Sequence, residues 1–264
     1  MKNFKLILLL GIIFLFQSCQ KENNNNVQYD NKVFENPFEQ VGVQHNEMLE
    51  NVLFNLKVSS KKEQIEFVNS YLENELKKIK LNTLDVVPEN YNKYVENHSV
   101  YYNGKDLYRA FLSLDKMSQK STSNSTYIYA RKNIQDEVND VLDFLDSNEL
   151  TLAGILEEVK KREIIAVGKF KQDELESIYS FYSTLRHSAK YWAPEKEGGK
   201  GGFDKYIAKQ HQASYSKTAR EADINWWKVG GCDAIGALVG SRGGFWGAVI
   251  TGAGASAISI IMQL

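Results

Sequence analysis

Cys232-Asp-Ala-Ile-Gly236-Ala-Leu-Val-Gly240-Ser-Arg-Gly-Gly244-Phe-Trp-Gly-Ala248-Val-Ile-Thr-Gly252-Ala-Gly-Ala-Ser256 is the stretch that decides the architecture of this 264-residue chain. Small residues recur every fourth position from Gly236 to Ser256, and mostly aliphatic or aromatic residues lie between them. A glycine inside a helix costs about 1 kcal/mol relative to alanine, so the pattern is unfavourable unless a second backbone approaches closely. The repeat therefore predicts a glycine zipper formed by Gly236, Gly240, Gly244, Gly252 and Ser256.

The same stretch predicts a helical hairpin over residues 230–264. Asp233 and Arg242 are its only charged residues, and Arg242-Gly243-Gly244 favours a turn between helices at 233–241 and 245–262. Residues 243–262 carry no formal charge and would span about 30 Å as one helix, which matches a bilayer core. The glycines dilute this hydrophobicity. We therefore expect a compact hairpin that packs on a partner, inserts weakly into a membrane, or completes a soluble bundle.

The N-terminal residues have the pattern of an export signal. Lys2 and Lys5 precede an apolar run over residues 6–16, and Ser18-Cys19 follows. A basic start, a run too short to span a membrane and a small residue before the cleavage point are typical of a secretory signal. Ser18-Cys19 resembles the lipobox of bacterial lipoproteins, in which the cysteine is acylated; the alternative is an ordinary signal peptide with an incidental cysteine. We predict a signal peptide at 1–18, lipidation of Cys19 and a disordered polar tether at 19–33.

Charge and cysteine content limit the function further. Cys232 is the only cysteine besides Cys19, so lipidation of Cys19 leaves no intrachain disulfide. Cys232 is interpreted as a buried small hydrophobic residue, or as a point of intermolecular crosslinking. Loss of residues 1–18 removes two of the 32 basic residues and no acid, which leaves 30 against 33 acidic residues. This balance argues against a nucleic-acid partner.

The sequence pattern of residues 34–229, the body, predicts an irregular bundle of six or seven helices, and therefore an all-α fold class. Apolar residues recur at helical spacing with breaks between them, and no alternating run is long enough to indicate a sheet. Ser59 or Ser60 is the expected cap of the second helix, and Gly198–Gly202 is the expected flexible break before the last. The expected helices cover residues 38–56, 65–79, 107–114, 134–145, 152–166, 175–189 and a polar segment from about 203.

Motifs of catalysis are absent from the sequence. It has no His-Glu-x-x-His, phosphate-binding loop, Gly-x-Ser-x-Gly or Cys-x-x-Cys, and His45, His98, His187 and His211 lie far apart. His45 lies on the apolar stripe of the first helix and is interpreted as a hydrogen-bonded core residue, whereas His187 is interpreted as a packing or surface residue. We therefore expect no catalytic residues, no metal site and no cofactor.

Two segments carry a resemblance to a known family. Asn36-Pro37-Phe38 with Val41-Gly42 and His45-Asn46-Glu47 is one, and Ser183-Thr-Leu-Arg-His-Ser188-Ala-Lys-Tyr191-Trp192 before an Ala/Gly-rich tail is the other. Together they resemble Bacteroidetes exported lipoproteins whose glycine-zipper tail is bacteriocin-like in character. The resemblance implies export and this architecture, and it implies no activity.

These features together predict a non-enzymatic lipoprotein of the cell envelope, held in the outer membrane. Its partners would be the lipid bilayer, through Cys19, and a membrane or protein contacted by the C-terminal tail. The alternative is a bacteriocin-like precursor or membrane-active antibacterial protein. In that hypothesis Gly230-Gly231, which resembles the double-glycine site of peptide bacteriocins, is the processing site.

Overall fold

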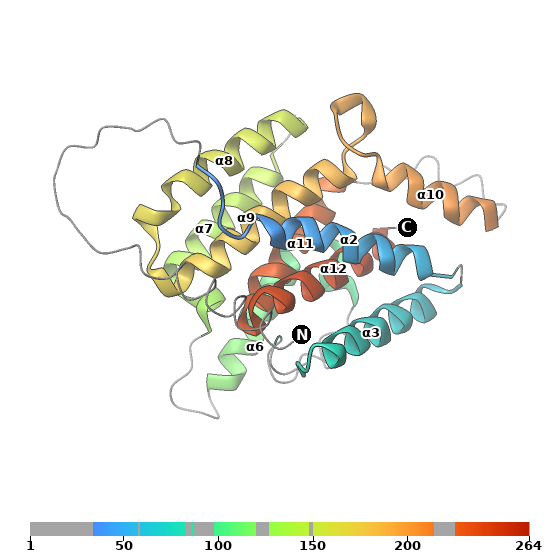
Figure 1. The fold of residues 1–264 in the computed structure, drawn as a ribbon, viewed down its shortest axis with the longest axis horizontal. Helices are drawn as coiled ribbons and strands as arrows, with labels where there is room; N and C mark the ends of the chain where they lie inside the picture. The colour runs from blue at the N-terminus through green and yellow to red at the C-terminus, as the bar shows by residue number, and fades with distance from the viewer. Residues whose placement is uncertain are drawn as a thin grey trace, which may run out of the picture. The chain divides into compact units, whose positions relative to one another are not determined.

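The computed structural model describes residues 34–57, 59–82, 86, 98–119, 127–147, 150–213 and 225–263, and it confirms the all-α fold class (Figure 1). None of the described residues forms a strand. Seven α-helices precede the C-terminal hairpin in this part of the chain: α2 (Glu39–Asn55), α3 (Lys61–Lys78), α6 (Gly104–Gln119), α7 (Lys132–Leu145), α8 (Leu152–Lys169), α9 (Gln172–Trp192) and α10 (Gly202–Ala213).

The glycine-rich tail folds as a hairpin of two helices. α11 (Trp226–Gly240) is followed by one short turn of 3-10 helix, η6 (Ser241–Gly243), and then by α12 (Gly244–Gln263). Gly244 has a φ of 68°, which favours glycine, and this residue reverses the chain direction. α11 begins before residue 230, so the hairpin is longer than the segment predicted from the sequence.

The hairpin lies inside the bundle and forms its core. α11 packs against α9 and α6, while α12 packs against α2 and α3 and lies between them in Figure 1. By length and composition, the segment Trp226–Gln263 is apolar enough to cross a membrane, yet 78% of its most apolar window is buried in the fold. The other helices therefore cover apolar faces that would otherwise be open to water or lipid.

Local sequence signals explain where several helices begin. The Ser60 hydroxyl accepts from the backbone N–H of Glu63, whose carboxylate accepts from the Ser60 backbone, so this pair forms a capping box at α3. Thr151 caps α8 with its hydroxyl alone, which accepts from the backbone N–H of Gly154, 3.1 Å away. Such caps satisfy backbone donors that the first helical turn leaves without partners.

α9 is the helix on which the rest of the body is arranged. It contacts α2, α8 and α11, and small hydroxyl residues on it are buried against these neighbours: Ser177, Ser180, Ser183, Thr184 and Ser188. The backbone N–H of Gly42 donates to the Ser183 hydroxyl at 3.1 Å. A Cβ atom at Gly42 would lie only 2.5 Å from the Ser183 carbonyl oxygen, so α2 and α9 cross too closely for any larger residue.

Residues Glu35–Leu264 form one compact unit. Several sequence-based predictions fall on residues that the structure does not describe. They are the signal peptide, Cys19 and the tether. Within the predicted 198–202 break, Gly198 ends a short 3-10 helix, η4 (Glu195–Glu197), and Gly201 directly precedes α10; their φ values are 87° and 60°.

Candidate functional site

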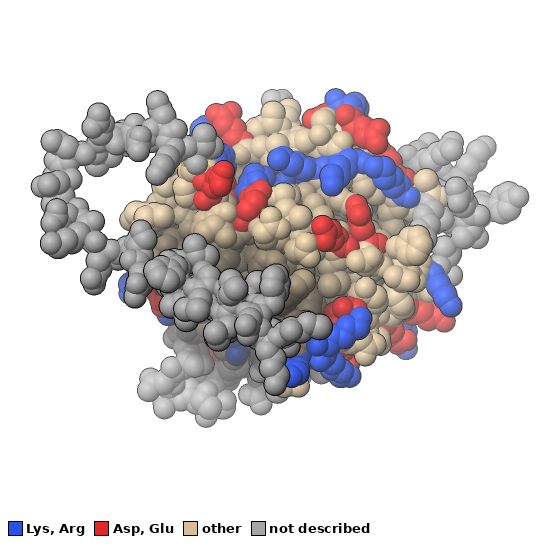
Figure 2. Space-filling model, viewed as in Figure 1, with Lys and Arg blue, Asp and Glu red and all other residues tan. Residues whose placement is uncertain are grey.

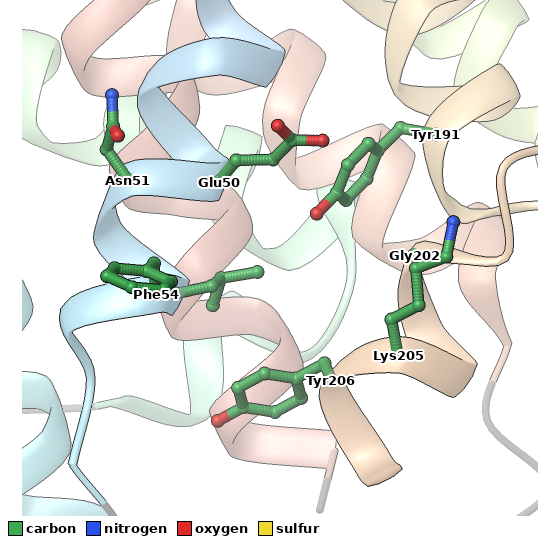
Figure 3. Close-up of a pocket in the computed structure, with 8 residues that line it drawn as sticks. Glu50, Asn51, Phe54, Tyr191, Gly202, Lys205 and Tyr206 are labelled. Atoms are coloured by element: carbon green, nitrogen blue, oxygen red, sulfur yellow. The ribbon is translucent and has the colours of Figure 1, made fainter. Parts of the chain in front are cut away.

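An open groove lies between the C-terminal half of α2, the end of α9 and the start of α10. Its volume is about 400 Å³. Figure 3 shows the Glu50 carboxylate of α2 directed toward the Tyr191 ring, with Tyr191, Lys205 and Tyr206 across the groove from α2. The groove is lined by Glu50, Asn51, Leu53, Phe54, Tyr191, Gly202, Lys205 and Tyr206.

The groove has the volume of a ligand pocket but is open to solvent. Its volume falls within the range of about 300–1,000 Å³ that is usual for ligand pockets. Tyr191 is buried, and its pKa is raised by this burial and by the nearby Glu50 and Asp233 carboxylates, so the phenol stays neutral. None of the eight lining residues is a histidine, cysteine or serine. The lining offers aromatic surface and two side chains of opposite charge, Glu50 and Lys205.

A second group of polar side chains is fully buried around Asp233 of α11. The Asp233 carboxylate accepts a short hydrogen bond from the Ser188 hydroxyl and one of 3.2 Å from the Trp192 indole N–H, both on α9. His45 Nε2 on α2 lies 3.8 Å from the same oxygen. The Asn46 amide donates to the His187 carbonyl at 3.0 Å, so its oxygen faces His45 Nδ1, also at 3.0 Å. Nδ1 therefore carries the proton of a neutral imidazole.

Burial moves the pKa values of this pair in opposite directions. It raises the pKa of Asp233 to about 7, against the opposing effect of hydrogen bonds from Ser188, Ser256 and Trp192. It lowers the pKa of His45 to about 4, while hydrogen bonds with Asn46 and Gly252 act the other way and the nearby His187 lowers the pKa further. Both groups are therefore neutral below pH 7 and above pH 4. Because neither is exposed, they hold helices together and do not meet a substrate.

A third group joins the start of α2 to α8 and α9. The Arg186 guanidinium binds both carboxylate oxygens of Glu39, and it donates to buried Glu163 at 3.0 Å. Asn36 donates to the same Glu163 oxygen at 2.8 Å. The Arg186 contact lowers the pKa of Glu39 to about 2, and His187 Nε2 lies 2.7 Å from this carboxylate. His187, expected to be a packing or surface residue, is thus half-buried and paired.

A comparable ion-pair group surrounds Glu137 of α7. Its carboxylate receives hydrogen bonds from Arg162 at 2.8 Å, from the Tyr182 hydroxyl at 2.5 Å and from Lys169. Burial would raise the pKa of Glu137, but these three donors outweigh it and the pKa is lowered. The carboxylate is therefore ionised and fully occupied by partners, as expected for a structural ion pair.

The residues of the predicted glycine zipper are not all on one contact surface. A Cβ at Gly236 would lie 2.5 Å from the Thr251 carbonyl, and one at Gly240 would lie 2.4 Å from the Gly247 carbonyl. Gly252 also lies at this contact, where a Cβ would be 3.2 Å from the Asp233 carbonyl of α11 and 2.9 Å from the His45 ring, and Ser256 is buried near Asp233. Gly244 lies in the turn, with open space where its Cβ would be. Gly247, which the four-residue spacing leaves out, is the residue that faces Gly240.

The remaining candidate residues divide between described and undescribed parts of the chain. Cys232 is buried; its thiol donates to the Tyr101 carbonyl, with an Sγ to oxygen distance of 3.3 Å, and burial raises its pKa. The side chains of His98 and His211, like Cys19, lie outside the described residues. Among the residues that are described, no three or more His, Cys, Asp or Glu side chains come together as metal ligands.

Comparison of the chain with models of protein families, with curated proteins and with solved structures finds no match. The resemblance to Bacteroidetes exported lipoproteins therefore stays a prediction. Figure 2 shows acidic and basic side chains mixed on one face of the molecule. Such a mixture differs from the basic surface that is typical of nucleic-acid-binding proteins.

Proposed function

We propose that this chain is a non-enzymatic lipoprotein of the bacterial cell envelope, tethered to the outer membrane through an acylated Cys19. In this proposal the glycine-rich tail serves helix packing within the body. The burial of α11 and α12 among α2, α3, α6 and α9 is the observation that carries the assignment of the tail. The lipobox-like Ser18-Cys19 supports the tether.

The contacts of the hairpin favour packing over membrane insertion. The Thr251 hydroxyl of α12 lies 2.7 Å from the Gly236 carbonyl of α11, and Ser177 of α9 lies 2.7 Å from Ser241. Asp233 adds bonds to Ser188 and Trp192. The Thr251 contact lies within the hairpin, but leaving the body would break the contacts of Ser241 and Asp233 with α9, and a membrane interior offers no water to replace them.

The bacteriocin-like alternative gains no support from the position of Gly230 and Gly231. Both glycines lie inside α11 and are buried. A Cβ at Gly231 would touch Leu142 and Gly104, and one at Gly230 would touch Ser188 and Leu185. A protease needs an extended, accessible segment, so cleavage here would require α11 to unfold first.

Lipidation is tested by metabolic labelling with a fatty-acid probe and by detergent phase partitioning. The wild-type chain should label and enter the detergent phase, and Cys19→Ala should do neither. Cys232→Ala is the matched control, because Cys232 is buried and should not be acylated. A Cys19→Ala chain that still labels would rule out the proposed tether.

The role of the tail is tested by comparing the folding stability and the liposome flotation of Gly240→Leu and Gly252→Leu with those of wild type. Each change raises hydrophobicity, so a simple lipid anchor would bind as well as wild type or better. A packing hairpin should lose stability, because Gly240 faces backbone atoms of α12 and Gly252 faces His45. Unchanged folding of both variants would contradict the packing role.

A further inference from the structure

α2 presents a carboxylate and an aromatic ring to the groove that it forms with α9 and α10. Glu50 and Phe54 both line this groove, and they lie four residues apart, so they occupy neighbouring turns on one face of the helix. Phe54 is 80% exposed, a large fraction for an aromatic side chain. A negative charge and an open aromatic face are therefore available side by side.

The Glu50 carboxylate is not neutralised within the described part of the chain. None of the described residues donates a hydrogen bond to it or forms an ion pair with it. Lys205, the other charged residue of the lining, extends toward Gly202 in Figure 3. Its ammonium donates to the Lys200 carbonyl at 2.5 Å and lies 3.7 Å from the Glu195 carboxylate. The positive charge in the lining is thus directed away from Glu50.

The side of the groove that faces α2 is held in place by packing. Tyr191 and Tyr206 are only 7% and 4% exposed. A Cβ at Gly202 would lie 2.5 Å from the Tyr191 ring, so the start of α10 packs directly on this ring. Figure 3 shows the Tyr191 hydroxyl pointing back toward α2, beside Glu50. Because these rings are fixed before a ligand arrives, binding costs little ordering of the protein.

We propose that this groove binds a small organic ammonium ion, a function that goes beyond envelope tethering and does not depend on it. The cationic nitrogen lies against the Glu50 carboxylate, and its alkyl groups contact the rings of Phe54 and Tyr191. Aromatic faces attract such cations through their electron density, and a carboxylate adds charge attraction.

The lining favours this ligand over other classes. An anion would be repelled by Glu50, and a neutral apolar molecule would leave that charge without a partner. Divalent metal ions such as Ca²⁺ need several oxygen ligands, whereas Glu50 is the only carboxylate in the lining. The volume of about 400 Å³ is that of a small-molecule site.

The test compares two probes of the same shape, choline and the uncharged 3,3-dimethylbutan-1-ol. Each is titrated by NMR into the full chain carrying Cys19→Ala, so neither detergent nor acylation affects the result. Choline should bind about tenfold more tightly than the alcohol, and its methyl signal should move upfield because it meets aromatic rings. Added salt should weaken the binding of choline alone. Equal affinity for the two probes would overturn the proposal.

Two substitutions at exposed positions assign the binding to this groove. Glu50→Gln should lower the affinity for choline about tenfold and leave that for the alcohol unchanged. Phe54→Leu keeps an apolar side chain but should reduce both the affinity for choline and its upfield shift. Glu47→Gln is the matched control, because Glu47 lies on α2 outside the lining and accepts from Gln44 at 2.8 Å. Unchanged choline binding in Glu50→Gln, or an equal loss in Glu47→Gln, would contradict the assignment.

Discussion

Gly240→Ala should destabilise the protein although alanine is the better helix former. A Cβ at this position would lie 2.4 Å from the Gly247 carbonyl oxygen and 1.7 Å from the Thr251 hydroxyl oxygen. Ordinary contacts between such atoms are about 3.5 Å, so α11 and α12 must separate by roughly 1 Å and Thr251 must change rotamer. The Thr251 hydroxyl would then lose its position 2.7 Å from the Gly236 carbonyl.

Three contributions decide how Gly240→Ala changes the free energy of unfolding. Overpacking costs about 1–3 kcal/mol, the lost hydrogen bond costs about 1 kcal/mol, and the better helix propensity of alanine returns about 1 kcal/mol. We expect the free energy of unfolding to fall by about 1–3 kcal/mol, which lowers Tm by roughly 3–10 °C for a body of this size. Circular dichroism during thermal and urea unfolding measures both quantities.

Gly168→Ala is the matched control for this prediction. Gly168 lies in α8, and nothing lies within 4 Å of the position of its Cβ. The same chemical change should therefore stabilise the protein by about 0.5–1 kcal/mol through helix propensity alone. A Gly240→Ala protein as stable as Gly168→Ala would refute the close approach of α11 and α12.

Three further predictions concern pH and capping. The pKa of Asp233 is raised to about 7, so its contribution to stability is complete below pH 4 and is lost as the pH rises to 7. The pKa of His45 is lowered to about 4, so its contribution is complete above pH 6.5 and is lost as the pH falls to 4. The two slopes nearly cancel in wild type. The free energy of unfolding measured in urea should therefore rise with pH in Asp233→Asn and fall with pH in His45→Gln, each by about 1.4 kcal/mol per pH unit between pH 4 and 6.5. Flat profiles in both variants would exclude this pair. Because the pKa of Glu39 is lowered to about 2, its contribution is present above pH 4.5 and lost as pH falls toward 2, and Glu39→Gln should remove this acid-dependent loss from a melting series; an unaltered acid limb would contradict it. Ser60→Ala should cost about 1 kcal/mol in urea unfolding by removing the α3 cap, with Ser59→Ala as a neutral control, and equal losses in the two would contradict the capping box.

Helix positions could be predicted from the sequence because they depend on local patterns. The stripe from Phe38 to Leu56 corresponds to α2, and Ser60 was one of two candidate caps for α3. The turn at Arg242-Gly243-Gly244 likewise follows from local chemistry, since Gly244 supplies the positive φ that the reversal needs. These features rest on contacts between residues only a few positions apart.

Contacts between distant helices could not be predicted in the same way. His45 and Asp233 are far apart in sequence, as are Glu39 and Arg186, and no periodicity indicates which helices dock together. The predicted glycine zipper assumed one straight helix face with a four-residue spacing. Because the chain reverses at Gly244, the prediction included Gly244, which lies in the turn, and missed Gly247, which faces Gly240. One feature of the sequence did indicate that α9 packs closely against other helices. Ser177, Ser180, Ser183, Thr184 and Ser188 follow helical spacing on α9, and small residues on one face permit close helix contacts.

Hydrogen–deuterium exchange of the α11 and α12 amides, with and without anionic vesicles, tests the central claim most directly. If the hairpin is the core of the body, its amides should exchange only through global unfolding, and vesicles should leave their protection unchanged. The amides of α2 and α9 should show matching protection, because they enclose the hairpin. Rapid exchange across Trp226–Gln263, or a change there on adding vesicles while α2 and α9 stay unaffected, would contradict the account.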